Sequence, residues 1–255
     1  MNVAQTLLLD VGNSSIKSAI LTIEGMEGSA RAFHNEVDLR AFIEHAWPYT
    51  SKPTRVIVAN VAGDEIAAKL TACTKSLWNL QPEFVVAQQT ACDVINAYSD
   101  SHKLGIDRWA ALIGARHITQ GAVCVVDCGT AITVDTLTAE GQHLGGLILP
   151  GLHTMQRSLL NNTRLVLSDE KSTPRTLTPF AKNTEDAVKS GILYAVVAAL
   201  DRALTDISSG LPVATPIITG GGAEYILPLL ARPYQHEPDL VLQGLAVIAQ
   251  AGSTH

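Results

Sequence analysis

The chain has 255 residues, of which 47% are hydrophobic and 16% are charged, and its formal net charge is −6. This hydrophobic share excludes a disordered or low-complexity chain, and the length allows one or two domains. No run of Lys and Arg occurs, so we do not expect nucleic acid to be a ligand. The low charged share predicts that part of the surface is covered by a second copy of the chain, as in a homodimer.

The sequence gives no sign of an export or membrane segment. Residues 1–9 contain no Lys or Arg, and Asp10 interrupts the first apolar run, which a signal peptide would continue. The longest apolar stretch, residues 192–200, is far shorter than the about 20 residues that span a bilayer. The cysteines, at 73, 92, 124 and 128, have neither disulfide-framework nor zinc-ligand spacing. We therefore expect a cytoplasmic protein with free thiols and no membrane partner.

The predicted elements of the first half open with a β-hairpin. Residues 6–9 and 16–23 have strand composition on either side of a polar turn, and a third strand is predicted over 30–34. A helix over 38–47 follows, with Asp38 as its N-cap and Pro48 as its stop. A strand over 55–60, a helix over 63–73, a strand over 83–87 and a helix over 105–118 complete this half. The order predicts a mixed sheet with helices packed on it.

The second half begins with two predicted strands, over 122–127 and 132–137. Residues 145–151 are predicted to form a strand-to-helix junction, and residues 168–178 a polar loop at an active-site mouth or a dimer edge. A long helix is predicted over 184–207, with acidic residues in its first turn. A strand over 216–219 leads into the glycine-rich residues 220–222 at a helix start. A short strand over 240–245 and a final helix close the chain.

One motif occurs twice. Asp10-Val-Gly-Asn returns 117 residues later as Asp127-Cys-Gly-Thr. Two unrelated turns would account for this, because Asp and Gly are common in turns. We interpret it as a duplication, because both copies join two strands and each opens one half. The chain is therefore predicted to be an α/β protein of two similar halves, 1–118 and 119–255, with mixed sheets and a ligand cleft between them.

The two turns have the composition of a nucleotide triphosphate site. Gly12 and Gly129 allow the backbone to approach a ligand and to present N–H groups to it. Lys17 is placed to reach a terminal phosphate, and the aspartate of each turn can hold a metal ion. Considered alone, Asp10 would stabilise its turn and Lys17 would be a solvated strand residue. The presence of two such hairpins favours phosphate binding.

Other glycine motifs are less specific. Residues 220–222 suit an adenosine or phosphate contact at a helix N-terminus, but packing at the helix start explains them equally. Neither a P-loop nor a Gly-x-Gly-x-x-Gly motif occurs, which disfavours Walker-type and dinucleotide folds.

Four motifs occur in one order: Asp10-Val-Gly-Asn-Ser-Ser-Ile-Lys17, Gly105-Ile-Asp-Arg108, Asp127-Cys-Gly-Thr-Ala-Ile-Thr-Val-Asp135 and Gly145-Gly-Leu-Ile-Leu-Pro-Gly151. Together they closely resemble the type III pantothenate kinases, a branch of the superfamily of acetate kinase, the sugar kinases and actin. The resemblance extends from Asp10 to about Leu245. The family usually has Thr where Ser14 stands, and serine keeps the hydroxyl.

The resemblance implies two ribonuclease H-like (actin-like ATPase) halves and ATP-dependent phosphorylation of pantothenate to 4′-phosphopantothenate, the first step of coenzyme A biosynthesis. It implies Mg²⁺ and a monovalent cation, K⁺ or NH₄⁺, as cofactors, with Asp127 at the monovalent cation. It gives Asp107 the role of general base. The implied ATP-binding residues are Asp10, Val11, Gly12, Asn13, Ser14, Ser15, Ile16, Lys17 and Thr130, and the implied pantothenate-binding residues are Tyr98, Gly105, Ile106, Asp107, Arg108 and Thr184.

The chemistry of these residues agrees with those roles. Transfer to an alcohol needs a proton acceptor such as Asp107, and the planar fork of Arg108 suits a substrate carboxylate. By spacing alone, Asp107 would be an N-cap or a solvated acid, Arg108 a solvated or salt-bridged residue, and Tyr98 a half-buried core aromatic. In the repeat, Val134 takes the place of Lys17, and a bound cation can supply the missing positive charge near Asp127. The histidines form no pair at ligand spacing and receive no role.

Two other functions remain open. One is a phosphotransferase or phosphatase of the same superfamily with another substrate, against which the Gly105–Arg108 motif argues. The other is a nucleotide-binding regulatory protein without catalysis, because some family members have been described as transcription accessory factors. The absence of a basic patch and the presence of both Asp10 and Asp107 favour an active enzyme.

Overall fold

The computed structural model describes residues 5–34, 37–49, 51–163, 178–211 and 214–252. The chain forms two compact units. Unit 1 comprises Met1–Gln120, Gly141–His143 and Asp239–His255, and unit 2 comprises Gly121–Glu140 and Leu144–Pro238. The sequence predicted one break between residues 118 and 119. The first break lies close to that position, but the end of the chain belongs to unit 1 and not to the second half.

Unit 1 contains a five-stranded mixed sheet in the order β3-β2-β1-β4-β5. Strands β1 and β2 form the predicted antiparallel hairpin, β3 extends it, and β4 and β5 add in parallel. The predicted strand over 83–87 is reduced to two residues. The strands are β1 (Thr6–Val11), β2 (Ser15–Thr22), β3 (Gly25–Phe33), β4 (Arg55–Asn60) and β5 (Glu83–Phe84).

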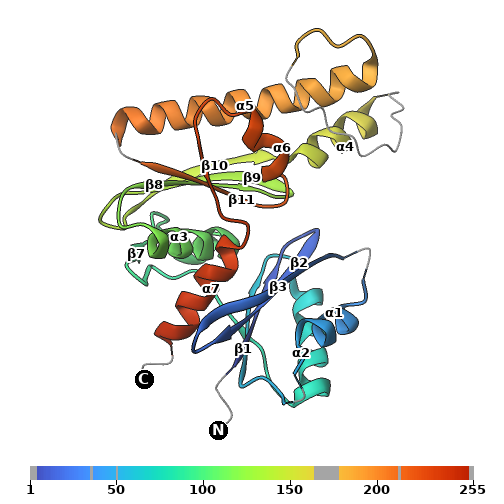
Figure 1. The fold of residues 1–255 in the computed structure, drawn as a ribbon, viewed down its shortest axis with the longest axis vertical. Helices are drawn as coiled ribbons and strands as arrows, with labels where there is room; N and C mark the ends of the chain where they lie inside the picture. The colour runs from blue at the N-terminus through green and yellow to red at the C-terminus, as the bar shows by residue number, and fades with distance from the viewer. Residues whose placement is uncertain (1–4, 35–36, 50, 164–177, 212–213, 253–255) are drawn as a thin grey trace. The chain divides into compact units, whose positions relative to one another are not determined.

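Helices cover both faces of this sheet (Figure 1). Helices α1 (Leu39–Ala46) and α2 (Asp64–Trp78) pack on one face, where Leu7 and Leu9 contribute to a shared apolar core. Helices α3 (Ile106–Ile118) and α7 (Leu240–Ala251) pack on the other face, to which Leu8 points because strand side chains alternate. The predicted cap is confirmed, since the Asp38 carboxylate accepts the Ala41 N–H at 3.0 Å. Helix α2 continues five residues beyond its predicted end at Cys73.

The prediction of a strand over 240–245 is wrong. Helix α7 begins at Leu240, and the short strand that precedes it, β12 (Gln235–His236), lies earlier in the chain. Nearly all side chains of α7 are apolar and most are buried, so its sequence shows no amphipathic period. A short apolar run of this kind does not distinguish a buried strand from a buried helix.

Unit 2 contains a second five-stranded sheet in the order β10-β9-β8-β11-β12. Its strands are β8 (Val123–Cys128), β9 (Ala131–Leu137), β10 (His143–Pro150), β11 (Thr215–Thr219) and β12. As in unit 1, the first two strands form an antiparallel hairpin. The last two add in parallel, β11 beside β8 and β12 beside β11. The equal strand order agrees with the duplication inferred from the two Asp-x-Gly motifs.

Unit 2 also contains three helical elements, which are α4 (Leu152–Asn162), α5 (Thr184–Gly210) and the single turn α6 (Ala223–Ile226) (Figure 1). Val196 and Leu200 of α5 pack on Val126 of β8 and Ile132 of β9 in one apolar core. Residues 168–177 of the predicted polar loop lie outside the described residues. In the described part of the chain, no helix is both long and apolar enough to cross a bilayer.

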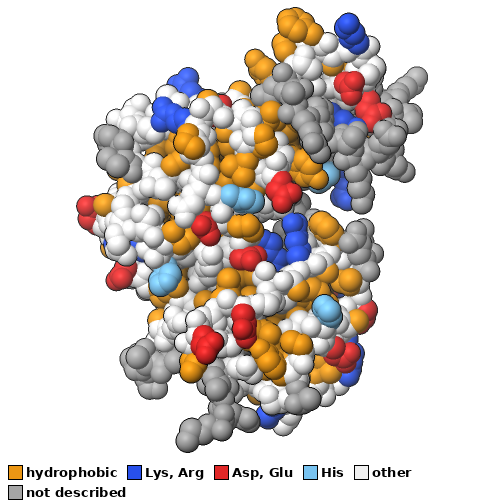
Figure 2. Space-filling model, viewed as in Figure 1, with side chains coloured by type: hydrophobic (Ala, Val, Ile, Leu, Met, Phe, Trp, Pro, Cys, Tyr) orange, Lys and Arg blue, Asp and Glu red, His pale blue; other side chains and the backbone are white. Residues whose placement is uncertain are grey.

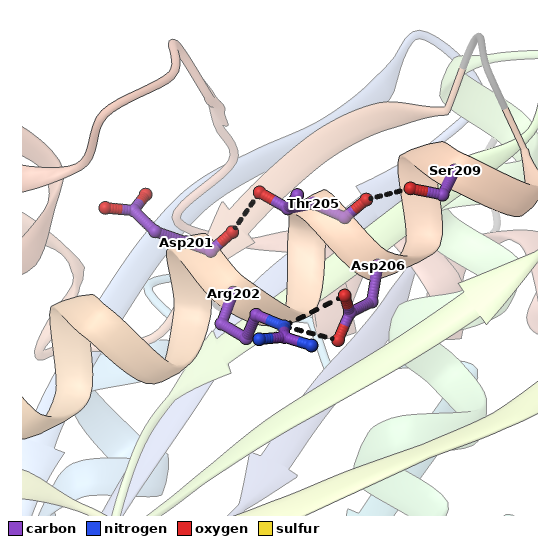
Figure 3. Close-up of polar contacts among 5 residues, drawn as sticks. All are labelled: Asp201, Arg202, Thr205, Asp206 and Ser209. Carbon is purple, nitrogen blue, oxygen red and sulfur yellow. Dashed lines mark hydrogen bonds and ion pairs between the residues drawn. The ribbon is translucent and has the colours of Figure 1, made fainter.

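The solvent face of α5 is polar and is stabilised by bonds within the helix (Figure 3). The Arg202 Nε donates to both carboxylate oxygens of Asp206, at 2.9 and 2.8 Å. The Thr205 hydroxyl donates to the Asp201 carbonyl at 2.7 Å, one turn earlier. Asp201 itself accepts the Ala231 N–H at 3.0 Å, which connects α5 to the segment after α6. The helix therefore combines an apolar face on the sheet with a bonded polar face in solvent.

Candidate active site

The first candidate hairpin places Asp10 directly opposite Lys17 in the register of β1 and β2. Residues opposite each other on neighbouring strands point to the same face of the sheet, so carboxylate and ammonium share one side of the hairpin. Both residues are half-buried, whereas Asn13 and Ser14 at the tip are exposed. The hairpin therefore presents one acid, one base and two small polar side chains toward the same end of the strand pair.

The turn of this hairpin is fixed by His34, which the sequence did not indicate. The His34 N–H donates to the Ser14 carbonyl at 3.1 Å, and its ring Nε2 donates to the Gly12 carbonyl at 2.8 Å. The Gly12 N–H donates to the Ser15 carbonyl at 3.0 Å. Both ends of the turn are thus held by hydrogen bonds, which reduces the reorganisation needed when a ligand binds.

The N–H groups of the two turn glycines are bonded within their own turns. Gly12 donates to the Ser15 carbonyl, and Gly129 donates likewise to the Ala131 carbonyl at 3.0 Å. The expectation that the backbone of these turns presents N–H groups to a ligand stays a prediction. The exposed polar side chains of the two turns, Asn13, Ser14 and Thr130, are the groups that remain on the surface.

The second hairpin corrects the comparison between the two repeats. Asp127 of β8 pairs with Thr133 of β9, and not with Val134 as a constant sequence offset suggests. The second turn is one residue shorter than the first, which shifts the register by one. Val134 consequently points into the core and is 2% exposed, and a hydroxyl stands where the first hairpin has Lys17. The repeat still lacks a counterpart of the lysine, but Thr133 replaces it.

Glycines from two later motifs pack behind this second turn. The Gly151 N–H and the Thr154 hydroxyl donate to the Thr130 carbonyl at 3.0 and 2.7 Å. A side chain at Gly151 would overlap the carbonyl oxygen of Gly129. The Gly222 N–H donates to the Cys128 carbonyl at 2.8 Å. Close backbone packing is thus one role of both glycine motifs.

Gly220 has a further consequence for Asp127. Its φ is +88°, and a Cβ there would overlap Oδ1 of the Asp127 carboxylate. A glycine is therefore required, because the Asp127 carboxylate and the Cys128 backbone pack directly against it. Asp127 itself is half-buried.

The candidate pantothenate residues of unit 1 lie around the start of α3. Arg108 is only 7% exposed, and its Nη1 donates to the Tyr98 hydroxyl at 3.0 Å. Its guanidinium carbon lies 5.8 Å from the centre of the Tyr98 ring. The structure therefore shows a direct contact between two residues that the sequence analysis proposed separately. Because Arg108 is buried, it is not a solvated helix residue.

Asp107 lies in the first turn of α3, where a helix favours negative charge. Its Oδ1 accepts the Arg108 N–H at 2.8 Å. The residue before the helix is Gly105, whose Cβ would stand 2.6 Å from that same oxygen. The glycine is therefore needed for the carboxylate to lie over the helix start, and Ile106 anchors the turn in the core at 7% exposure.

The loop that carries Tyr98 is organised by Asn96, another residue that the sequence did not indicate. Asn96 is 3% exposed, and its Nδ2 donates to the carbonyls of Gln88 and Ser101, both at 3.2 Å. Its Oδ1 accepts the Tyr98 N–H at 2.9 Å. A buried amide that bonds three segments of one loop gives the loop a single conformation. Asn is common in loops, so the sequence around Asn96 does not indicate this role.

Thr184 is the first residue of α5 and belongs to unit 2. It is exposed, and the helix is capped by its neighbour Asn183, whose Oδ1 accepts the Asp186 N–H at 2.8 Å. The other pantothenate candidates, Tyr98 and Gly105–Arg108, all belong to unit 1.

The thiols of unit 2 are buried in the sheet. Burial and the nearby Asp135 carboxylate raise the pKa of Cys124 to about 12. Burial and Asp127 raise the pKa of Cys128 well above its ordinary value. Cys73 and Cys92 are half-buried, and desolvation also raises the pKa of each. Among the described residues, no cluster of three or more His, Cys, Asp or Glu could hold a metal ion by itself.

Comparison with solved structures shows the fold. A putative Baf family transcriptional activator from Campylobacter jejuni aligns with a TM-score of 0.61 and 22% identity, over 97% of this chain and 99% of that one. An archaeal actin homolog aligns with a TM-score of 0.52 and 12% identity, over 96% and 99% of the two chains. The actin-like α/β fold expected from the sequence is confirmed.

Comparison of sequences shows the family. The model of the type III pantothenate kinase family matches residues 6–206. A type III pantothenate kinase from Nitrosococcus oceani is 39% identical over 250 residues, which cover 96% of this chain and 93% of that protein. One from Nitrosomonas eutropha is 37% identical over 258 residues, covering 99% and 98% of the two. The chain belongs to the type III pantothenate kinase family.

Proposed function

We propose that the protein transfers the γ-phosphoryl group of ATP to the primary hydroxyl of pantothenate, giving 4′-phosphopantothenate and ADP at the entry to coenzyme A biosynthesis. The observation that carries the assignment of the site is the start of α3. There, the buried guanidinium of Arg108 is bonded to Tyr98, and the half-buried carboxylate of Asp107 lies at the preceding position of the helix. Side chains of consecutive helix residues point about 100° apart, so an anion clamp at Arg108 and a proton acceptor at Asp107 can serve the two ends of a substrate that has a carboxylate at one end and an alcohol at the other.

We assign the carboxylate of pantothenate to Arg108. Its planar fork forms two parallel hydrogen bonds to a carboxylate, and its burial excludes the water that would compete for them. The bond from Nη1 to Tyr98 reduces the number of conformations of the side chain before the substrate arrives. Gly105, Ile106 and Thr184 complete the proposed pantothenate site.

We assign the attacking hydroxyl to Asp107. The hydroxyl oxygen forms a bond to the γ-phosphorus while the bond from that phosphorus to the β,γ-bridging oxygen breaks, and the hydroxyl proton passes to the Asp107 carboxylate. The bond from the Arg108 N–H to Oδ1 holds the carboxylate in place. Because phosphoryl transfer has a loose transition state, positioning of the hydroxyl contributes more than the strength of the base.

The ATP phosphates belong, in this proposal, to the two hairpins. Lys17 shares one face of the first hairpin with Asp10, and Asn13, Ser14 and Thr130 supply exposed polar groups at the turns. The backbone of Val11, Gly12, Ser15 and Ile16 fixes their placement. His34 and Gly151 support the two turns from behind, so the donors are held in place before the ligand binds.

The residues fit the two cations that the family implies. Mg²⁺ commonly needs only one or two protein carboxylates beside nucleotide phosphates, and Asp10 offers one. For the monovalent cation, K⁺ or NH₄⁺, the half-buried carboxylate of Asp127 offers a negatively charged oxygen ligand. Both ions supply positive charge that offsets the repulsion among phosphate and carboxylate groups when bound.

A homodimer in the cytoplasm is part of this proposal. The exposed apolar side chains Leu144, Leu147 and Ile148 of β10 support a dimer through unit 2. The four free cysteines support a reducing compartment. On the face drawn in Figure 2, Lys and Arg side chains occur only in small separate groups, which gives no support to a nucleic-acid partner.

Release of ADP in the presence of pantothenate, followed by a coupled assay, tests the function. Asp107→Asn is expected to fold and to bind ATP while its kcat falls about 10²- to 10⁴-fold, the usual contribution of a general base. Asp64→Asn is the matched control, because Asp64 also lies in the first turn of a helix of unit 1.

Full turnover by Asp107→Asn would contradict the assignment of the base. Absence of pantothenate-dependent ADP release from the unmodified protein would contradict the function and favour the regulatory alternative.

A further inference from the structure

His143 is a buried titratable residue to which the proposed function gives no role. It is 1% exposed and is the first residue of β10, within the segment Gly141–His143 that belongs to unit 1. Its side chain lies among residues of the loop that carries Tyr98. An apolar side chain would fill the same volume without the free-energy cost of burying two ring nitrogens, so a specific role for this imidazole is expected.

The imidazole stacks on Tyr98. The two ring centres are 6.2 Å apart and the ring planes differ by 14°. The His143 Nδ1 accepts the N–H of Ala97, the residue before Tyr98, at 3.5 Å. The histidine thus contacts both the ring of Tyr98 and the backbone that leads to it. The hydroxyl of the same ring accepts the bond from Arg108.

The segment that carries His143 is itself fixed on the loop. The Ile95 N–H donates to the Gly141 carbonyl at 2.9 Å, and Ile95 pairs with Gln142 in an isolated parallel bridge. Gly141 has a φ of +81°, and a Cβ there would overlap the carbonyl oxygen of Asp93. Only glycine allows this close approach, so the position of His143 is set by backbone contacts with the residues that precede Tyr98 in the loop.

We propose that His143 is a positioning residue for pantothenate: it holds the Tyr98 ring so that Tyr98 in turn fixes Arg108 in the orientation that binds the substrate carboxylate. The chain of contacts runs from imidazole to phenol to guanidinium, through residues of unit 1. This inference rests on the proposed pantothenate site. It adds a residue that does not itself contact the substrate, and it predicts an effect on pantothenate binding with no effect on ATP.

Two substitutions separate the stacking from the hydrogen bond. His143→Asn keeps an acceptor for the Ala97 N–H but removes the ring, and His143→Phe keeps a flat ring but removes the acceptor. We expect His143→Asn to raise KM for pantothenate about 3- to 10-fold, the range of an aromatic pair, with kcat and KM for ATP within about twofold of the unmodified enzyme. His143→Phe restores most of the affinity.

His117→Asn is the matched control. His117 is exposed and lies on α3, nine residues after Arg108 and about 13 Å along the helix. A change in pantothenate KM for this variant equal to that of His143→Asn would mean that loss of any histidine suffices, and would overturn the proposal.

A double-mutant cycle with Tyr98 gives the decisive measurement. If His143 acts through Tyr98, His143→Asn has no further effect on pantothenate KM once Tyr98→Leu is present. Additive effects would show that the two residues act independently, and would overturn the proposal. So would a normal KM for His143→Asn, or a raised KM for His143→Phe alone.

The experiment distinguishes an error in the proposed pantothenate site from an error in the proposed role of His143. Arg108→Lys is measured beside the other variants. An unchanged pantothenate KM for Arg108→Lys overturns the assignment of the site. A raised KM for Arg108→Lys with a normal KM for His143→Asn overturns only the role of His143.

Discussion

The helix that carries Asp107 and Arg108 depends on a contact between two glycines. Gly114 of α3 and Gly244 of α7 allow the two backbones to touch. A Cβ on Gly114 would stand 2.5 Å from the Leu240 carbonyl oxygen, and a Cβ on Gly244 would stand 2.6 Å from the Ala110 carbonyl carbon and would overlap its oxygen. Gly244→Ala adds one methyl group at the tightest point of this contact, so the helices have to separate by about 1 Å or more to reach ordinary contact distance.

The expected cost follows from two opposing effects. Alanine is the better helix former by about 1 kcal/mol, which favours the variant. Overpacking a well-filled core costs about 1–3 kcal/mol, and here the obstacle is backbone that cannot rotate away, so the upper end of that range or more applies. We therefore expect a net loss of about 2 kcal/mol, which lowers Tm by about 4–8 °C in a chain of this size.

The same displacement affects the site. A shift of α3 by about 1 Å moves Asp107 and Arg108 together, and misplacement on that scale can cost up to about 10²-fold in rate. Thermal unfolding followed by circular dichroism and steady-state kinetics with pantothenate measure the two effects on one sample.

Gly191→Ala is the control for this substitution. Gly191 lies inside α5, is exposed, and has nothing within 4 Å of its Cβ position. It should gain about 0.5–1 kcal/mol from helix propensity alone. If Gly244→Ala is also stabilised, with unchanged kinetics, the close contact between α3 and α7 does not exist as described.

Four other outcomes are expected. Arg108→Lys raises pantothenate KM with a smaller effect on kcat, because one ammonium cannot replace a two-pronged contact; equal KM values for pantothenate and its carboxylate amide in the unmodified enzyme contradict this. K⁺ raises Tm relative to a sodium buffer, and Asp127→Asn abolishes the shift without unfolding the protein; an equal shift in the variant returns Asp127 to a structural role. A thiol reagent at pH 8 leaves Cys124 and Cys128 unmodified until the protein unfolds, because burial raises the pKa of both; labelling of either in the folded state contradicts their burial. Glu83→Gln lowers Tm at pH 6. The difference shrinks as the pH falls through the pKa of Glu83, which Arg55 holds below its ordinary value, because the stabilisation is lost when the carboxylate protonates. At about half exposure this ion pair is worth no more than about 1 kcal/mol, and a difference in Tm that stays the same from pH 6 down to about pH 2 excludes the pair as its source.

The sequence predicted those parts of the fold in which local signals agree. The strand over 55–60 and the helix over 38–47 were predicted closely, because a strand run bounded by polar residues and a capped helix are both local patterns. Helix α7 was missed because nearly all of its residues are apolar, so its sequence shows no amphipathic period. Its membership of unit 1 could not be predicted, because contacts between residues more than 100 positions apart leave no local pattern.

In the candidate site, too, the sequence predicted which residues take part but not how they are arranged. Asp107 and Arg108 were found as members of a motif, but their bonds to the helix start and to Tyr98 needed the structure. The predicted pairing in the second hairpin was wrong by one residue. A turn that is one residue shorter changes every pair of facing residues but leaves the amino-acid composition of the strands the same. Three residues that the sequence did not indicate contact the candidate site residues or their loops: His34, Asn96 and His143. Such contacts depend on tertiary packing, which a single sequence does not reveal.

The return of the chain to unit 1 sets an order of folding during synthesis. Residues 1–120 leave the ribosome first, yet the face of the unit 1 sheet that α7 covers stays open until residues 240–251 are made. Apart from the three residues 141–143, unit 2 is continuous in sequence and has all its elements before that point. At a synthesis rate of about 5–20 residues per second, the older unit waits roughly 7–25 s for its last helix. Throughout that interval the face of α3 around Gly114 lacks the helix that covers it in the complete fold.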